Sequence, residues 1–310
     1  MSLIEQAAKR LEQLRQAGVE LPEDAVARDQ LSQIPAQKAT ERDTPRQTSS
    51  PDPITPLPVG KEANRVNLDF EAMAASGLLV PSQSRNVLAN EFRVIKRPLI
   101  ANAMGKGATP VTNGNLVMIT SALPGEGKSF TAINLAISIA MELDNTVMLV
   151  DADVARPSVL NMLGLPPTEG LLDVVNENSL DISRVLLRTN IEKLSILPSG
   201  TPHPRATELL ASDAMIRLLD DMAKRYPDRI IIFDSPPLLL TTEARALATH
   251  MGQIVVVVQS GETTQAAVKE AVATINACPL KMMVLNKATQ SASDRYGYGY
   301  AYGYGYGNEK

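Results

Sequence analysis

Tryptophan, cysteine and histidine are nearly absent from this chain of 310 residues. It has no tryptophan, two histidines and one cysteine, Cys278, so an intrachain disulfide is excluded and a reducing compartment is indicated. It has no run of eighteen apolar residues, and its opening residues, MSLIEQAAKRLEQLRQ, carry charges throughout, unlike a signal peptide. We therefore expect a cytoplasmic protein that needs a partner for any role at a membrane.

Basic residues are too few for a nucleic-acid surface. The 30 lysines and arginines are outnumbered by 34 acidic residues, which gives a net charge of −4, whereas neutralising phosphates requires a basic excess. Apolar residues make up 44% of the chain, which is ordinary for a packed core. The composition predicts a globular protein without a nucleic-acid partner.

The beginning of the chain differs in composition from its middle. Residues 1–20 are predicted to form an amphipathic helix, because Ser2 and Glu5 have capping-box spacing and apolar residues recur every three to four positions. Docking of its apolar stripe on the domain or on a partner is one expectation, and a locally packed or marginal helix is the alternative. Residues 21–85 are polar and carry five prolines between positions 45 and 58, which predicts a mostly disordered linker.

Residues 86–290 are expected to form the globular domain, which begins with a helix that Pro98 should kink or break. Its predicted strands are LVMIT, TVMLV, KLSIL, RIIIF, QIVVVV and KMMVL, most of them separated by enough residues for crossover helices. This alternation predicts an α/β fold with a mainly parallel sheet covered by helices on both faces. Ligands of such folds bind beyond the carboxyl ends of the strands.

A glycine-rich loop, SALPGEGKSF, follows the first predicted strand and precedes a helix. Its Gly127-Lys128-Ser129 matches the end of the phosphate-binding loop, although Ala122 replaces the first glycine of the strict pattern. Lys128 is expected to reach the outer phosphates of a nucleotide and Ser129 to bind Mg²⁺. The alternative is a glycine-rich turn with an exposed lysine. The expected nucleotide contacts are Pro124, Gly125, Glu126, Gly127, Lys128, Ser129 and Phe130.

Aspartates follow two other predicted strands. Asp151 and Asp153 come after TVMLV, and Asp234 comes after RIIIF. A Mg²⁺ ion bound mainly by phosphates and water needs few protein carboxylates, held on the same edge of the sheet as the loop. Each aspartate has helix capping as its alternative role, but all three at one predicted edge favour a nucleotide site.

The residues after the last predicted strand favour ATP over GTP. Asn286 lies where the base of a nucleotide would be expected, with a turn residue as its alternative role. A guanine-specific N/T-K-x-D motif would require a carboxylate at position 289, where this chain has Thr289.

Six of the seven tyrosines lie in a low-complexity tail, residues 291–310, that we expect to be flexible. They are Tyr296, Tyr298, Tyr300, Tyr302, Tyr304 and Tyr306. If the chain is a kinase, these hydroxyls are its phosphate acceptors, and the intervening glycines leave the backbone free to present one ring after another. A sticky end or a stacking platform is the alternative.

Together, PGEGKS, VDADVARP, IIIFDSPP and the terminal tyrosines resemble the bacterial tyrosine kinases, the P-loop kinases of exopolysaccharide systems. MSLIEQAAKRLEQLR and EFRVIKRPLI are more narrowly similar to the exosortase-associated tyrosine autokinases. The resemblance covers about residues 86 to 306 and the first helix. It implies an ATP-dependent autokinase that phosphorylates its own tail and regulates exopolysaccharide or capsule biosynthesis or export.

The resemblance also implies roles for individual residues. The implied catalytic residues are Lys128, Asp151, Asp153 and Asp234. Among them, Asp151 and Asp153 are implied to bind the metal ion and to activate the tyrosine hydroxyl. Ser129, Asp151 and Asp234 are the implied Mg²⁺ ligands. The second motif departs from the family, because Ala155 stands where an arginine is common and Arg156 follows it.

The implied partners are a membrane polysaccharide chain-length regulator, whose cytoplasmic segment activates the kinase at the inner membrane, and a tyrosine phosphatase. The implied assembly is a homo-oligomeric ring. Its oligomer helix departs from the family pattern E-x-x-R-x-x-R, because this chain has Asn90, Arg93 and Lys96.

A non-kinase ATPase switch of the division-site or partition type has a similar core and is the alternative function. Such a protein would not need a tyrosine tail, and the chain lacks a C-terminal basic amphipathic helix that could lie on lipid. The sequence therefore favours the kinase.

Overall fold

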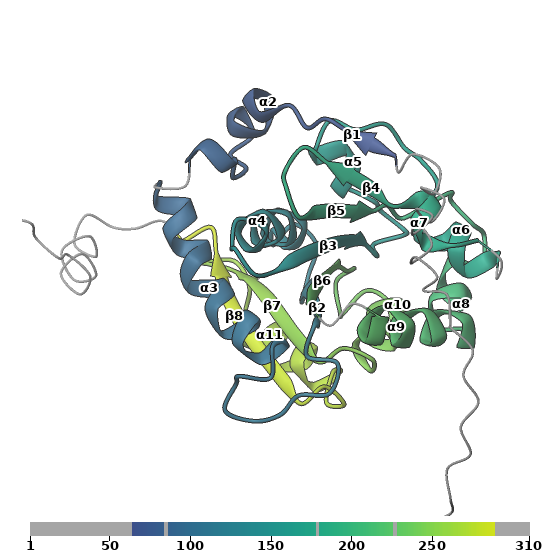
Figure 1. Ribbon diagram of the computed structural model, residues 1–310. Helices are drawn as coiled ribbons and strands as arrows, with labels where there is room; N and C mark the ends of the chain where they lie inside the picture. Colours follow the sequence, from purple (N-terminus) through teal and green to yellow (C-terminus); the bar gives the residue numbers. More distant parts are fainter. Residues whose placement is uncertain (1–63, 84–85, 178–179, 226–227, 289–310) are drawn as a thin grey trace, which may run out of the picture. The chain divides into compact units, whose positions relative to one another are not determined.

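An eight-stranded sheet forms the centre of the computed structural model, which describes residues 64–83, 86–177, 180–225 and 228–288 (Figure 1). The strand order is β1-β4-β5-β3-β6-β2-β7-β8, and every neighbouring pair is parallel except β4 and β5. The predicted, mainly parallel α/β fold is therefore confirmed. The strands are β1 (Arg65–Val66), β2 (Leu116–Ser121), β3 (Thr146–Asp151), β4 (Leu187–Thr189), β5 (Leu194–Leu197), β6 (Arg229–Asp234), β7 (Gln253–Gln259) and β8 (Leu280–Asn286).

Helices cover both faces of the sheet, and alternate residues of the buried strands enter two separate cores. Met118 of β2 belongs to the core with α6 to α11, whereas the next residue, Ile119, belongs to the core with α2 to α5. The helices are α2 (Phe70–Ala75), the 3-10 helix η1 (Pro81–Gln83), α3 (Val87–Ala103), α4 (Lys128–Ala140), α5 (Val159–Met162), α6 (Leu171–Asn176), α7 (Ile182–Val185), α8 (Ala206–Leu210), α9 (Asp213–Arg225), α10 (Thr242–Ala248) and α11 (Gln265–Ala273). None of the described helices is long and apolar enough to cross a membrane.

All six apolar runs that were predicted as strands form strands. The short strands β1 and β4 were not predicted, because two or three residues give no periodicity to recognise. The ordered domain also begins earlier than predicted. Residues 64–83, interpreted as the end of a linker, contribute β1, α2 and the buried residues Leu78, Leu79 and Val80.

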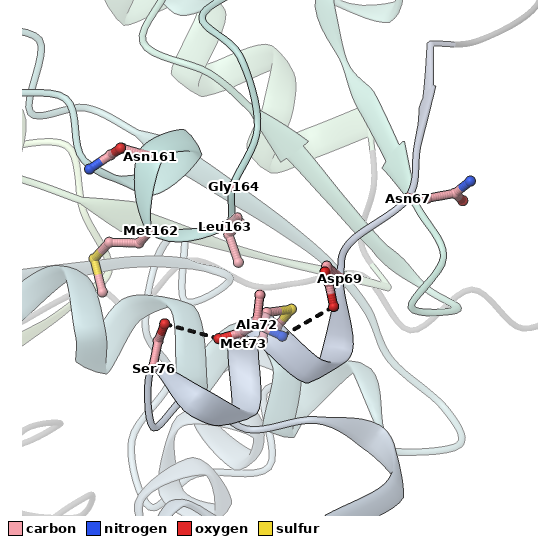
Figure 2. A pocket seen from close by; sticks show the side chains of 9 residues that line it. All are labelled: Asn67, Asp69, Ala72, Met73, Ser76, Asn161, Met162, Leu163 and Gly164. Carbon is pink, nitrogen blue, oxygen red and sulfur yellow. Dashed lines mark hydrogen bonds between the residues drawn. The ribbon is translucent and has the colours of Figure 1, made fainter.

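The segment before Asn86 is tied to the core by a buried hydrogen bond. The N–H of Leu79 donates to Oδ1 of Asn134 in α4 at 2.6 Å. A hollow of about 270 Å³ lies between α2 and the end of α5, and Figure 2 shows Asp69 and Ser76 bonded to the α2 backbone on one side and Asn161 on the other. The predicted helix at residues 1–20 and the tyrosine tail lie outside the described residues.

Pro98 was predicted to kink or break the helix, and helix α3 continues through it, so the break does not occur. Lys96, which the family resemblance placed on the oligomer face, is buried against α4. Its Nζ donates to the carbonyl of Ser138 at 2.5 Å and lies 2.7 Å from Oε1 of Glu142. Burial lowers the pKa of Lys96, against the opposing effect of Glu142. Lys96 therefore joins two helices within one chain.

We predict that Glu142→Gln lowers the free energy of unfolding by about 1–3 kcal/mol, because it leaves a buried ammonium without its carboxylate. Arg97→Ala is the matched control. It removes a 64% exposed partner 3.5 Å from the same carboxylate, and should cost less than about 0.5 kcal/mol. Urea unfolding measures both. Equal losses would contradict the assignment of Glu142 as the partner of Lys96.

Candidate active site

The glycine-rich loop lies where β2 ends and α4 begins. Gly125 and Gly127 have φ angles of +82° and +95°, which glycine adopts without strain. Because α4 starts at Lys128, the positive end of the helix follows the loop directly, as an anion site requires. Ala122, which replaces a glycine of the strict pattern, is buried in the core.

The side chain of Glu126 fixes the loop from inside. It is buried and accepts a hydrogen bond from the N–H of Leu123 at 2.6 Å. Its other oxygen accepts one from the hydroxyl of Thr263, just beyond β7, and a longer one from the N–H of Gln259. Of the predicted nucleotide contacts, Glu126 thus directs its carboxylate into the protein. Thr263 was not singled out from the sequence, which carries no local signal for it.

The end of β8 holds the same loop from outside. Nδ2 of Asn286 donates to the carbonyl of Glu126 at 2.8 Å, and a Cβ atom at Gly127 would overlap this amide. Nζ of Lys287 donates to the carbonyl of Gly125 at 2.7 Å. Asn286, predicted to lie beside a base, therefore contacts the backbone of the loop. Lys287 is a further loop contact that the sequence did not reveal.

The lysine and the three predicted aspartates meet at one edge of the sheet. Asp151 ends β3 and Asp234 ends β6, and the two residues are paired in register. Nζ of Lys128 lies 2.7 Å from Oδ2 of Asp153 and 3.8 Å from Oδ1 of Asp234. All three carboxylates are buried. The structure therefore brings together the groups that the strand ends predicted.

Asp151 is also a helix cap, the alternative role considered for these aspartates. Its Oδ2 accepts hydrogen bonds from the N–H groups of Ser158 and Val159, at 3.1 and 3.0 Å, where α5 begins. The hydroxyl of Ser158 donates to Oγ of Ser129 at 2.8 Å. Ser158 was not predicted, and it connects the proposed metal-binding hydroxyl to the start of α5. The hydrogen bonds at the start of α5 use Oδ2 of Asp151, so its Oδ1 atom stays available to a ligand at the candidate site.

Burial makes two of the carboxylates unusually basic. It raises the pKa of Asp151 to about 7, with the charge of Asp234 as the second cause. It raises the pKa of Asp234 to about 6, although Lys128 opposes this rise. Within the described residues, Oδ1 of Asp151 and both carboxylate oxygens of Asp234 accept no hydrogen bond. Such oxygens suit a hard cation.

The site does not form a complete metal cage by itself. No group of three or more histidine, cysteine, aspartate or glutamate side chains in the described parts of the chain is arranged to hold a metal ion. A Mg²⁺ ion would therefore take much of its coordination from phosphate oxygens and water, as it does at nucleotide sites. The donor set fits that role.

Three related proteins, YwqD, CapB and EpsB, are all named as tyrosine-protein kinases or putative tyrosine-protein kinases. Residues 115–288 match the model of the AAA domain family. The chain is 37% identical over 186 residues to tyrosine-protein kinase YwqD of Bacillus subtilis, which covers 58% of this chain and 76% of that protein. It is 26% identical over 223 residues to putative tyrosine-protein kinase CapB of Staphylococcus aureus, with 71% and 93% covered. The match to putative tyrosine-protein kinase EpsB of Ralstonia nicotianae is 30% identical and spans 24% of that longer protein.

Solved structures agree with these relatives. The chimerical protein CapA2B2 superimposes with a TM-score of 0.58 and 28% identity, over 74% of this chain and 94% of that chain. The kinase domain of the Escherichia coli tyrosine kinase ETK gives a TM-score of 0.50 and 26% identity, over 62% and 73%. Since the AAA match runs through the nucleotide loop and both aspartate strands, and since YwqD shares more than a third of its aligned residues, the chain belongs to the bacterial tyrosine-protein kinases.

Proposed function

We propose that this chain uses ATP and Mg²⁺ to phosphorylate the tyrosine cluster at its own C-terminus, as part of an exopolysaccharide or capsule system. The observation that carries the proposal is the position of Lys128. Its ammonium lies within 4 Å of Asp153 and Asp234, directly after a glycine-rich loop whose backbone can receive phosphates.

Lys128 connects nucleotide binding to the availability of a base. Its ammonium pairs with Asp153 at 2.7 Å, and the phosphates of ATP compete for the same ammonium. Once Lys128 turns to the phosphates, the carboxylate of Asp153 is free to accept the proton of a tyrosine hydroxyl. This matters because a phenol, with an ordinary pKa of about 10, is a poor nucleophile at neutral pH.

Ser129, Asp151 and Asp234 would hold the Mg²⁺ ion at this edge. When bound, the ion neutralises the charge that develops on the transferred phosphoryl group. The chain orients these ligands beforehand. Ser158 fixes the hydroxyl of Ser129, and the first N–H groups of α5 fix one oxygen of Asp151.

We also propose a homo-oligomer that is recruited to the inner membrane by the cytoplasmic segment of a polysaccharide chain-length regulator and reset by a tyrosine phosphatase. The helix at residues 1–20 and the tail at 291–310 complete the proposed domain organisation. These proposals rest on the family resemblance. A partition-type ATPase switch is disfavoured because the relatives above are tyrosine-protein kinases.

Lys128→Met should lower phosphotyrosine formation by about a hundredfold or more, because the outer phosphates lose their cation. Because the buried carboxylate of Asp153 loses its ammonium partner, Lys128→Met should also lower the free energy of unfolding by about 1–2 kcal/mol without unfolding the chain. The matched control is Lys224→Met, which changes a lysine that is 78% exposed and should label normally. The measurement is phosphotyrosine mapping by mass spectrometry after incubation of the purified chain with ATP and Mg²⁺. Wild-type labelling in Lys128→Met would refute the proposed site.

Replacing the six tail tyrosines by phenylalanine should abolish labelling and leave the affinity for ATP unchanged, because the tail is the substrate and not part of the nucleotide site. Tyr226 is the remaining tyrosine and serves as an internal control. Labelling that moves to Tyr226 at an undiminished rate would show that the tail is not the preferred acceptor.

The contribution of Asp151 and Asp234 to the stability of the purified chain, without added metal or nucleotide, should fall as the pH rises from about 4 to 7. The pKa of an unfolded aspartate is near 3.9, whereas in the folded state the pKa of Asp234 is about 6 and that of Asp151 is about 7. Their contribution to the free energy of unfolding is therefore full at low pH, and it is lost as the two carboxyl groups ionise. Asp234→Asn should flatten this fall and raise the unfolding free energy at pH 8 by roughly 1–3 kcal/mol.

Asp181→Asn is the control for that experiment. Asp181 caps α7, and its pKa is lowered rather than raised, so its replacement should bring no gain at pH 8. Thermal melts at several pH values measure both variants. Saturating Mg²⁺ and ATP should then stabilise the wild type more than Asp234→Asn. If Asp234→Asn melts below the wild type at pH 8, burial of an ionised Asp234 is not costly.

A further inference from the structure

Strand β8 has an apolar face that the described part of the chain leaves largely uncovered. Met283 and Leu285, two residues apart and so on one face, are 59% and 63% exposed. Met282 and Val284, on the opposite face, pack against the core that contains α3. A groove of about 530 Å³ lies between the uncovered face and α11, and its lining includes Val258, Gln259, Val268, Lys269, Met283 and Leu285.

The same strand has a free edge. β8 is the last strand in the sheet order and pairs only with β7 among the described strands, as Figure 1 shows for the yellow strand at the margin of the sheet. An edge strand presents unpaired N–H and C=O groups that can receive another extended segment. The groove and the free edge therefore suit an occupant that is a strand with large apolar side chains on one face.

The tyrosine tail has this pattern. Its six tyrosines occupy every second position from Tyr296 to Tyr306, and glycine or Ala301 lies between them. In an extended strand all six rings would project from one face, and nothing larger than a methyl group would project from the other. The small face matches the side of the sheet where α3 packs, and the ring face matches the groove.

The chain also leaves β8 in a way that allows the tail to return. Lys287, directly after the strand, has a φ of +56° and is held by Gly125 and Gln259. Ala288 is the last described residue, and the eight residues from there to Tyr296 span up to roughly 26 Å when extended. A strand of seven residues, the length of β8, is about 23 Å long. An antiparallel return needs only a turn beside the end of β8, so the tether is more than long enough, and it could also span the strand for a parallel return.

We propose that about seven residues within 296–306 of the same chain pair with β8 as an additional antiparallel strand and place their three or four tyrosine rings in the groove beside α11. This docking does not depend on the proposed kinase activity. Combined with that activity, it would withhold the tyrosines from any active site. Phosphorylation would also oppose it, because each phosphate adds about −1.5 to −2 charges and Lys269 is the only cation among the described residues that line the groove.

Intrinsic tyrosine fluorescence reports directly on the tail, because the chain has no tryptophan and six of its seven tyrosines lie there. Full-length, phosphatase-treated protein should therefore show slow acrylamide quenching. Introducing Met283→Glu together with Leu285→Glu should release the rings and raise the quenching constant about twofold. Leu143→Glu, at a leucine that is 87% exposed between α4 and β3, is the matched control and should change nothing.

A second pair of variants tests the strand itself. Gly299→Pro with Gly303→Pro keeps every tyrosine but removes two N–H groups, so it should release the rings and speed hydrogen exchange in β8. Gly299→Ala with Gly303→Ala should retain protection, since Ala301 already occupies the small face. Circular dichroism and thermal melts verify that each variant is folded.

Three results would overturn the proposal. Wild-type quenching as fast as that of N-acetyltyrosinamide would show that the tail does not dock. Unchanged quenching in the groove variant and in the proline variant would place the rings elsewhere. Protection that appears only as protein concentration rises would assign the groove to the tail of a second copy. None of these readouts requires catalysis, so they remain informative even if Lys128→Met fails to abolish labelling.

Discussion

The contact between one ammonium group and two buried carboxylates organises the candidate active site. Lys128 lies 2.7 Å from Asp153 and 3.8 Å from Asp234, at the ends of neighbouring parallel strands. Without a cation nearby, three carboxylates at this depth would repel one another and would be poorly solvated. The loop must therefore place Lys128 accurately, and the hydrogen bonds that hold the loop serve this electrostatic requirement as well as nucleotide binding.

Those hydrogen bonds come from distant parts of the chain. Asn286 and Glu126 are 160 residues apart in the sequence, and Thr263 and Glu126 are 137 apart. Their side chains join the first strand of the nucleotide site to the last two strands of the sheet. A change at the end of β8 can thus alter the phosphate loop without touching a nucleotide.

The sequence predicted a feature of the fold or site where a local residue pattern could be interpreted with a general rule of protein structure. Asp151 and Asp234 were found because each follows four apolar residues of a predicted strand, and parallel strands end at a common edge. Glu126 was assigned to the nucleotide by its place in the loop, but its inward carboxylate depends on Thr263 and Gln259, which no local pattern connects to it. The domain boundary at 86 was too late for a similar reason. Leu78, Leu79 and Val80 are few apolar residues next to a polar segment, and only their contacts with α4 distinguish them from a linker.

Helix α5 is a single turn that adjoins the candidate site at its first residue and the hollow beside α2 at its last residues. Its first N–H groups hold Asp151, and Ser158 holds the hydroxyl of Ser129, whereas its last residues line the hollow beside α2. The four residues of α5 are thus hydrogen-bonded to Asp151 at their first end and adjoin the hollow at their last end. A change in the position of this turn would alter its hydrogen bonds to Asp151 and Ser129 together, so the two ends of α5 connect the hollow beside α2 to the candidate site.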